Sequence, residues 1–169
     1  MRFVVVQDYK ENRRKCTLSP LEGRPGFTFL RLGHPERSSP KVEISSGVML
    51  VVGAPPLVRD DAPLLAEGSL FIVDSTWART SKVFDRISVR RGACLHARSL
   101  PPGFTTAYPR VSKVHRDPPE GLASVEALFA AAAVLGEPRP DLLEGYHWAR
   151  EFLERNAELL RGLEAPART

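Results

Sequence analysis

Apolar residues gather along this chain in short continuous runs that are separated by polar and turn-forming residues. Runs at residues 2–6, 48–52 and 70–73 are rich in valine, isoleucine and leucine, and glycine, proline or aspartate stands close after them. Short uninterrupted runs of this kind predict strands that are buried on both faces. We expect a further short strand near residues 27–32 and another strand at 93–100, where apolar and polar positions alternate.

Helical spacing appears between and after these runs. Thr80, Val83, Phe84 and Ile87 recur at helical intervals after Trp77, and the cationic residues fall largely elsewhere on that helix. Residues 62–67 predict a short helix. Residues 122–135 predict a longer one with Ser124 as a possible cap, and 141–163 predict a long amphipathic helix with an acidic outer face. Strands separated by helices predict an α/β fold with a parallel sheet.

The composition fits one globular domain that folds without disulfides. The chain has 169 residues, of which 43% are hydrophobic and 26% charged, and its two cysteines are far apart in the sequence. No window approaches the apolar length of a membrane span, and a carboxylate interrupts the N-terminal run. We therefore expect a reduced, cytoplasmic protein that neither spans a membrane nor is exported.

The net charge of +4 conceals a strongly basic middle segment. Residues 1–78, 79–116 and 117–169 carry +1, +8 and −5, counted from 10 Lys/Arg against 9 Asp/Glu, 9 against 1 and 5 against 10. Such a concentration of cations favours RNA or DNA as a partner, because it displaces counterions from phosphates. The alternative is that the basic middle faces the acidic C-terminal helix within the fold. The candidate RNA-binding residues are Arg79, Lys82, Arg86, Arg90, Arg91, Arg110 and Lys113.

Common catalytic and metal-binding motifs are missing from the sequence. It contains no phosphate-binding loop, dinucleotide fingerprint, zinc-protease helix or nucleophile elbow, and its four histidines lack metal-ligand spacing. We predict no metal site. What remains is the segment Asp74 to Trp77, which follows a buried strand at the sheet edge where α/β proteins build ligand sites. As pure structure, Asp74 caps the next helix and Trp77 is a core aromatic.

Two further segments also allow both a structural and a functional interpretation. Residues 98–109 form a turn-rich stretch with Pro101, Pro102 and Gly103, and residues 121–127 begin a helix. Structurally, they are a strand end, a loop and a helix start. Functionally, they offer backbone donors and an apolar slot for an adenine-bearing ligand beside the Asp74 strand.

Taken together, these segments resemble the Tsr3 family of ribosomal RNA aminocarboxypropyltransferases. The resemblance covers nearly the whole chain and rests on the order and spacing of short motifs. These are Lys15-Cys16-Thr17, Ile72-Val73-Asp74-Ser75-Thr76-Trp77-Ala78-Arg79, Arg98-Ser99-Leu100-Pro101, Ala107-Tyr108-Pro109-Arg110-Val111, Leu122-Ala123-Ser124-Val125-Glu126-Ala127-Leu128, and Gly145-Tyr146-His147-Trp148 with Phe152-Leu153-Glu154-Arg155-Asn156.

The resemblance implies a SPOUT-like α/β domain with a deep C-terminal trefoil knot. It divides the chain into a small N-terminal α/β region at 1–46, a catalytic domain at 47–163 and a tail at 164–169. It also implies that S-adenosylmethionine donates its 3-amino-3-carboxypropyl group to a uridine or pseudouridine N3 in ribosomal RNA, leaving methylthioadenosine. Asp74 would be catalytic, as a base or by orienting the donor. The implied cofactor-binding residues are Thr17, Asp74, Trp77, Leu100, Ala107, Tyr108, Leu122 and Ser124.

Several alternatives stay open beside this interpretation. The Asp-x-x-Trp motif also resembles the DTW-domain transferases, which modify transfer RNA, although many of those carry cysteine pairs that this chain lacks. The other classes are a SPOUT RNA methyltransferase and a non-catalytic RNA-binding assembly factor. The family usually reads Asn-Pro-Val-Asn-Tyr-Gly where this chain reads Tyr108 to Lys113, which bears on the RNA target. Either a monomer or a homodimer is compatible with the sequence.

Overall fold

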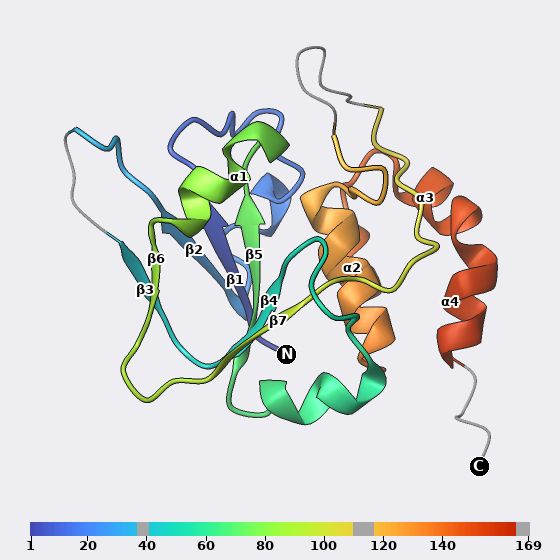
Figure 1. Cartoon of the computed structure of the whole chain (residues 1–169). Helices are drawn as coiled ribbons and strands as arrows, with labels where there is room; N and C mark the ends of the chain where they lie inside the picture. Colours follow the sequence, from blue (N-terminus) through green and yellow to red (C-terminus); the bar gives the residue numbers. More distant parts are fainter. Residues whose placement is uncertain (37–40, 110–116, 165–169) are drawn as a thin grey trace.

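A parallel sheet forms the centre of the molecule. The computed structural model describes residues 1–36, 41–109 and 117–164 (Figure 1). The sheet has the strand order β2-β1-β5-β4-β7, and each neighbouring pair is parallel, as the sequence predicts. Its strands are β1 (Phe3–Gln7), β2 (Phe27–Arg31), β4 (Gly47–Leu50), β5 (Ser69–Asp74) and β7 (Leu95–Arg98).

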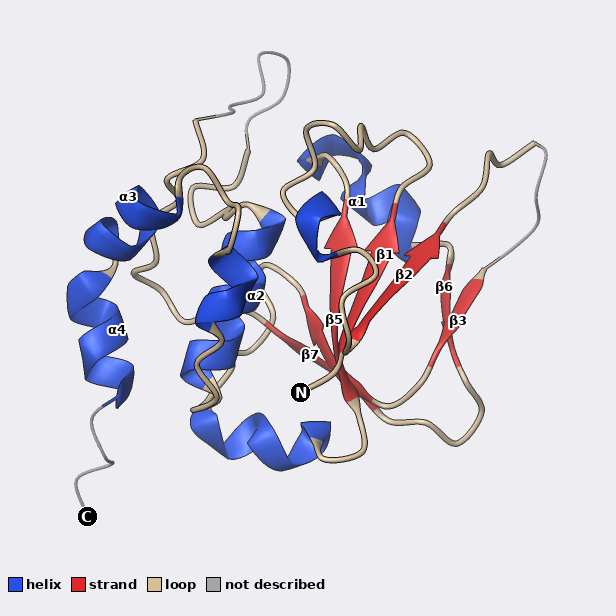
Figure 2. Ribbon diagram, turned by 180° about the vertical axis from the view of Figure 1, so that it is seen from behind, coloured by secondary structure: helices blue, strands red, loops and turns tan. Residues whose placement is uncertain are grey.

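The two faces of this sheet are covered by different layers. Helix α2 (Ser124–Val134), with α3 (Ala149–Arg155) and α4 (Ala157–Glu164) beyond it, lies on one side, and the second sheet lies on the other (Figures 1 and 2). That second sheet pairs β3 (Val42–Ile44) with β6 (Ile87–Val89), and α1 (Trp77–Phe84) packs beside it. Short 3-10 helices complete the fold at η1 (Ser19–Leu21), η2 (Arg59–Leu65) and η3 (Pro140–Leu143).

Alternation along the strands explains how polar residues come to face α2. Val5 and Ile72 belong to the buried cluster on the α2 side, whereas Val6 belongs to the cluster on the opposite side. The next residues on the α2 side are Gln7 and Asp74, which are partners in the β1–β5 register. Two polar side chains therefore meet at the carboxyl ends of the two central strands, beneath the start of α2.

The second sheet is a feature that the hydrophobic pattern did not predict. Strand β3 lies in a stretch rich in glycine, proline and serine, and Ile87 was assigned by its spacing to the helix after Trp77. Helix α1 ends at Phe84, so Arg86 and Ile87 lie beyond it. Each of these strands has only three residues, which is too short for a period-2 pattern to be distinguished from a helical one.

The predicted long helix at 141–163 is wrong, because the structure divides it into η3, α3 and α4. Gly145 has φ of 77°, a left-handed conformation that ends the first piece. Asn156 separates the other two, since its side-chain amide donates to the carbonyl oxygens of Phe152 and Thr105. On α3, Leu153 is 39% exposed, whereas its neighbour Phe152 is fully buried in the core.

The N-terminal segment does not form a separate sheet. Strand β1 lies between β2 and β5, so strands from residues 1–46 and from residues 47–163 share one hydrogen-bonded sheet. The division of the chain into those two regions remains a prediction, and the tail at 164–169 lies almost wholly outside the described residues.

Candidate functional site

A large cavity opens at the carboxyl ends of β4 and β5. Its volume is about 1340 Å³, and its walls come from segments that are far apart in the sequence. The end of β5 and the start of α1 provide one wall, and the turn-rich chain after β7 and the start of α2 provide others. Parallel strands place ligand sites at this edge, because loops and helix starts converge there. The segments singled out in the sequence therefore surround one cavity.

Asp74 is held in this cavity by three hydrogen bonds. Its side chain is 5% exposed, its Oδ2 accepts from Gln7 Nε2 at 3.0 Å and from Cys16 Sγ at 3.0 Å, and its Oδ1 accepts from Ser124 Oγ at 2.9 Å. Arg31 fixes the amide of Gln7, because its Nε donates to Gln7 Oε1 at 2.9 Å. Both oxygens of Asp74 are thus occupied by donors, an arrangement that orients a carboxylate firmly.

The thiol of Cys16 acts as a neutral donor in this cluster. Burial, reinforced by the charge and hydrogen bond of Asp74, raises the pKa of Cys16 to about 12. The thiol therefore keeps its proton at neutral pH and is not a thiolate nucleophile. Its neighbour Thr17 accepts a hydrogen bond from the backbone N–H of Val125 at 3.3 Å, so the N-terminal segment is tied to both β5 and α2.

These contacts replace the purely structural roles that the sequence also allowed. Thr76, not Asp74, is the N-cap residue of α1, and Trp77 is 37% exposed and belongs to neither buried cluster. Ser124 is not the cap of α2 either, because Ala123 occupies that position and the Ser124 hydroxyl points to Asp74. Local sequence cannot reveal this partner, which lies 50 residues away.

Comparison with known proteins agrees with this arrangement. A family model described as "Ribosome biogenesis protein, C-terminal" matches residues 48–167. This chain belongs to the Tsr3 family. A solved structure, described as the SAM-dependent rRNA:acp-transferase Tsr3 from Vulcanisaeta distributa, is similar with a TM-score of 0.69 and 22% identity. The match covers 96% of this chain and 83% of that one, and it shows a shared fold. The curated proteins contain no match.

Most of the cofactor-binding residues implied by the Tsr3 resemblance do line the cavity. They are Thr17, Asp74, Trp77, Leu100, Tyr108, Leu122 and Ser124. Ala107 is not on the wall, since its side chain is buried and its backbone N–H donates to Glu126 Oε1 at 2.9 Å. The residue still matters for the site, because that bond fixes the chain just before Tyr108. The role of each residue in this Tsr3-family chain remains a prediction.

Arg79 lies at the cavity but is engaged within the protein. Its Nη2 donates to Asp8 Oδ1 at 3.0 Å, its Nε also pairs with Asp8, and its guanidinium lies 5.1 Å from the centroid of the Tyr9 ring. Burial works to raise the pKa of Asp8, but the hydrogen bonds and charge of Arg79 outweigh it and hold that pKa below its ordinary value. Arg79 thus links the loop after β1 to α1, and the charge count did not reveal its partner Asp8.

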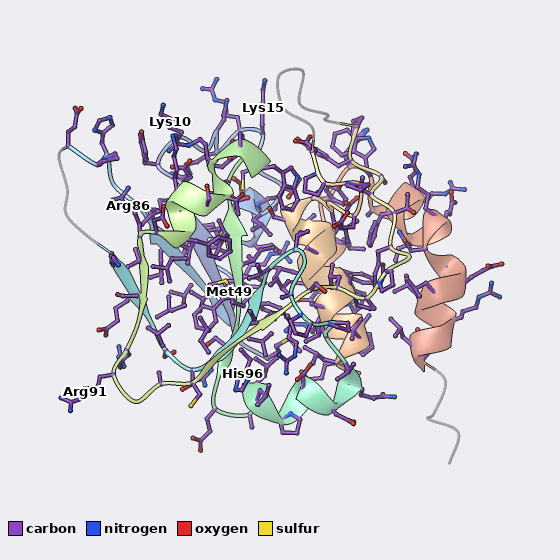
Figure 3. The ribbon with its side chains drawn as sticks, viewed as in Figure 1. Lys10, Lys15, Met49, Arg86, Arg91 and His96 are labelled. Atoms are coloured by element: carbon purple, nitrogen blue, oxygen red, sulfur yellow. The ribbon has the colours of Figure 1, made fainter. Side chains whose placement is uncertain are left out.

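The other cations predicted to bind RNA are spread over the surface. Lys82 is exposed on α1, whereas Arg86 donates to the Gly33 carbonyl at 2.8 Å. Arg90 pairs with Glu43, and Arg91 projects from the β6–β7 turn at the end of the strands away from the cavity (Figure 3). Arg110 and Lys113 lie outside the described residues.

The basic middle does not serve to neutralise the acidic C-terminal helices in the part of the chain that the structure describes. Its salt bridges run to the N-terminal side, from Arg79 to Asp8, Arg90 to Glu43 and Arg98 to Asp61. Arginines within the C-terminal segment pair with its own acidic residues, at Arg139–Asp141, Arg150–Glu154 and Arg155–Glu151.

A second buried carboxylate, Glu126, organises the opposite wall. Glu126 is fully buried, and its carboxylate accepts four hydrogen bonds. The donors are Thr106 Oγ1 at 2.5 Å, Ala107 N at 2.9 Å, Ala123 N at 3.0 Å and Tyr146 Oη at 2.9 Å. Burial, followed by the negative charge of Glu126, raises the pKa of Tyr146 well above its ordinary value, so its hydroxyl remains a donor.

Asn156 completes this support. Its Oδ1 accepts from the Thr105 backbone N–H at 2.7 Å, and its Nδ2 donates to the Thr105 carbonyl at 2.9 Å. The chain before Tyr108 is therefore held by Glu126 on one side and Asn156 on the other.

Among the described residues, no helix is long and apolar enough to cross a membrane and no cluster of His, Cys, Asp and Glu could hold a metal ion.

Proposed function

We propose that this protein transfers the 3-amino-3-carboxypropyl group of S-adenosylmethionine to N3 of a uridine-type base in ribosomal RNA. The observation that carries the proposal is the single cavity in which the Asp74–Trp77 segment, the chain after β7 and the start of α2 converge. Membership of a ribosome biogenesis family and the fold shared with a SAM-dependent rRNA:acp-transferase support the same activity. They also favour ribosomal over transfer RNA.

The cavity has the chemistry and size that this donor needs. Leu50, Ile72, Leu100 and Leu122 give apolar surface for adenine, while the hydroxyl-bearing and acidic residues beside them supply polar contacts. Drug-sized ligands occupy pockets of roughly 300 to 1,000 Å³. At about 1340 Å³, the cavity leaves room for a nucleotide of the RNA beside the donor.

The proposed reaction is a displacement at carbon. The N3 nitrogen of the base forms a bond to the γ-carbon of the aminocarboxypropyl arm, and the bond from that carbon to the sulfonium sulfur breaks. The electron pair stays on sulfur, which leaves as neutral methylthioadenosine, and the N3 proton passes to water. Orientation decides which carbon of the sulfonium faces the base. In our proposal Trp77 and the neighbouring aliphatic side chains bury the methyl group.

Asp74 has an orienting role in this proposal. A general base needs an oxygen free to accept the substrate proton within hydrogen-bond reach. Both oxygens of Asp74 already accept hydrogen bonds from Gln7, Cys16 and Ser124, and because the residue is only 5% exposed, the remaining lone pair of Oδ1 has little room for an RNA base. The carboxylate instead holds β5, the Cys16 segment and the start of α2 in the positions that shape the cavity.

Finer features implied by the resemblance belong to the same proposal. We include the SPOUT-like C-terminal trefoil knot, a cytoplasmic location and a monomeric or homodimeric state. The shared fold with a Tsr3 structure supports the knot, and ribosomal RNA as substrate supports the location.

Product analysis tests the activity. Incubation with carboxyl-labelled S-adenosylmethionine and total RNA is expected to place the label on ribosomal RNA and to release methylthioadenosine. S-adenosylhomocysteine as the main product would identify a methyltransferase instead. Label on transfer RNA would contradict the assigned substrate, and no binding of S-adenosylmethionine would indicate a non-catalytic assembly factor.

The RNA is proposed to approach over the basic loop after β1. Lys10 and Lys15 project from the same edge of the molecule to which the cavity opens (Figure 3), and Arg13 and Arg14 lie between them in the sequence. These exposed cations are well placed for phosphates beside the cavity, whereas Arg90 and Arg91 are near the other end of the strands.

We expect the double reversal K10E/R14E to weaken RNA binding by about 10-fold or more and to reduce the salt dependence by about two phosphate contacts. Neither residue lines the cavity, so the dissociation constant for S-adenosylmethionine should stay within about two-fold of wild type. The matched variant is R90E/R91E. An equal loss of RNA affinity from that pair would extend the RNA path along β3 and β6 and contradict a contact confined to the cavity edge.

A further inference from the structure

Gly121 lies in direct contact with the indole of Trp77 at the cavity wall. A Cβ atom built on Gly121 would stand 2.9 Å from Trp77 Cζ2, 3.1 Å from Trp77 Cε2 and 2.9 Å from the carbonyl oxygen of Pro118. Separations under 3.0 Å are not seen for real Cβ atoms. Any side chain at this position would therefore displace the indole, the turn or both.

This requirement for glycine comes from the contact and not from the backbone conformation. Gly121 is absent from the glycines with positive φ, so an alanine could adopt its backbone angles. Its N–H donates to the Pro118 carbonyl at 2.9 Å and closes a tight turn. The missing Cβ thus makes space for two neighbours, the indole of Trp77 and the carbonyl of Pro118, and both of these residues line the cavity.

Trp77 depends on this turn because the protein core does not hold it. The residue begins α1, is 37% exposed and is not part of either buried cluster. The turn at 118–121 is therefore one surface against which the indole lies.

We propose that Gly121 is a specificity-determining positioning residue, which sets where the Trp77 indole stands and thereby which carbon of the sulfonium faces the RNA. The inference rests on the proposed function and deepens it. With no side chain at position 121 the indole lies close to the turn, and in this proposal the space beside the indole takes the methyl group of S-adenosylmethionine. Moving the ring outward, by about 0.5 Å or more to restore an ordinary contact, reduces that recess and turns the donor. Near-attack geometry is sensitive to shifts of this size.

The test is Gly121→Ala combined with Trp77→Phe. We expect G121A to weaken S-adenosylmethionine binding by about 10-fold and to raise the share of S-adenosylhomocysteine among the products, since misplacement on the order of 1 Å costs up to about 100-fold. Phenylalanine lacks the fused ring that contacts Gly121. In the W77F background only the contact with the Pro118 carbonyl remains, so G121A should weaken binding clearly less than it does beside Trp77. The control is Gly162→Ala, where an added Cβ meets no atom within 4 Å.

A readout without any ligand separates this inference from the proposed function. The chain has two tryptophans, so in a W148F background the emission of Trp77 alone can be followed. G121A is expected to shift that emission and its quenching by acrylamide. An unchanged emission, or an equal loss of affinity with Trp77 and with W77F, would overturn the role of Gly121. A wild-type protein that forms no methylthioadenosine would refute the transfer activity while the emission still tested the contact.

Discussion

Replacing Asp74 with alanine is expected to lower the free energy of unfolding by about 2–4 kcal/mol, because three donors lose their acceptor in a buried site. The Gln7 amide cannot turn to another partner without losing its bond from Arg31. The cavity floor should loosen, and binding of S-adenosylmethionine should fall by more than about 10-fold. Urea unfolding and calorimetric titration measure the two effects.

Asp74→Asn distinguishes an orienting residue from a general base. An asparagine can turn its oxygen toward Gln7 and Cys16 and its amide toward Ser124, whose hydroxyl also accepts. We therefore expect a stability loss of only about 1 kcal/mol. If Asp74 orients the donor, the transfer rate should keep at least about a tenth of its wild-type value. A rate loss of about 100- to 10,000-fold with unchanged donor affinity would show that it is a base.

Glu126→Ala is expected to have the largest effect on stability, about 3–5 kcal/mol, since it leaves two buried and two partly buried donors without an acceptor. Two of these donors are backbone N–H groups, at Ala107 and Ala123, and cannot rotate away. The chain before Tyr108 and the start of α2 should separate. Thermal unfolding and amide hydrogen exchange at these residues measure the loss.

Glu126→Gln should not rescue the site as Asp74→Asn does. Oε1 accepts from Ala107 N and Oε2 accepts from Ala123 N, so a glutamine amide would face a backbone N–H in either orientation. We expect a cost of about 1–3 kcal/mol for that one unsatisfied pair. A glutamine variant as stable as wild type would contradict the assignment of a buried carboxylate acceptor.

The local hydrophobic pattern was sufficient to predict the buried strands of the central sheet. The runs at 48–52 and 70–73 became β4 and β5, because a continuous apolar run has few stable places other than a buried strand. The local pattern failed where a contact with a distant residue overrides helix propensity. Asn156 breaks the predicted C-terminal helix since its side chain binds Thr105, 51 residues earlier, and no periodicity records that bond.

The candidate site, like the fold, was predicted from the sequence only in part. Most of the cofactor-binding residues that the resemblance implied line one cavity, but their supporting partners were not apparent from the sequence. Nothing in the sequence marked Gln7 or Glu126 as a partner of these residues, and Gly121 stood only at the start of the segment 121–127. Arg79 looked like a free cation, although Asp8 claims it. Each partner is separated from its target by tens of residues, except where Glu126 also binds Ala123.

The β1–β5 register has a consequence for the order of folding. Gln7 finds its partner Asp74 67 residues later in the chain, and Thr17 reaches Val125 across 108 residues. Contacts of such wide separation form late, because the intervening loops must be closed first. The floor of the cavity is thus completed only after the start of α2 has been synthesised, and a shorter nascent chain lacks the complete cavity.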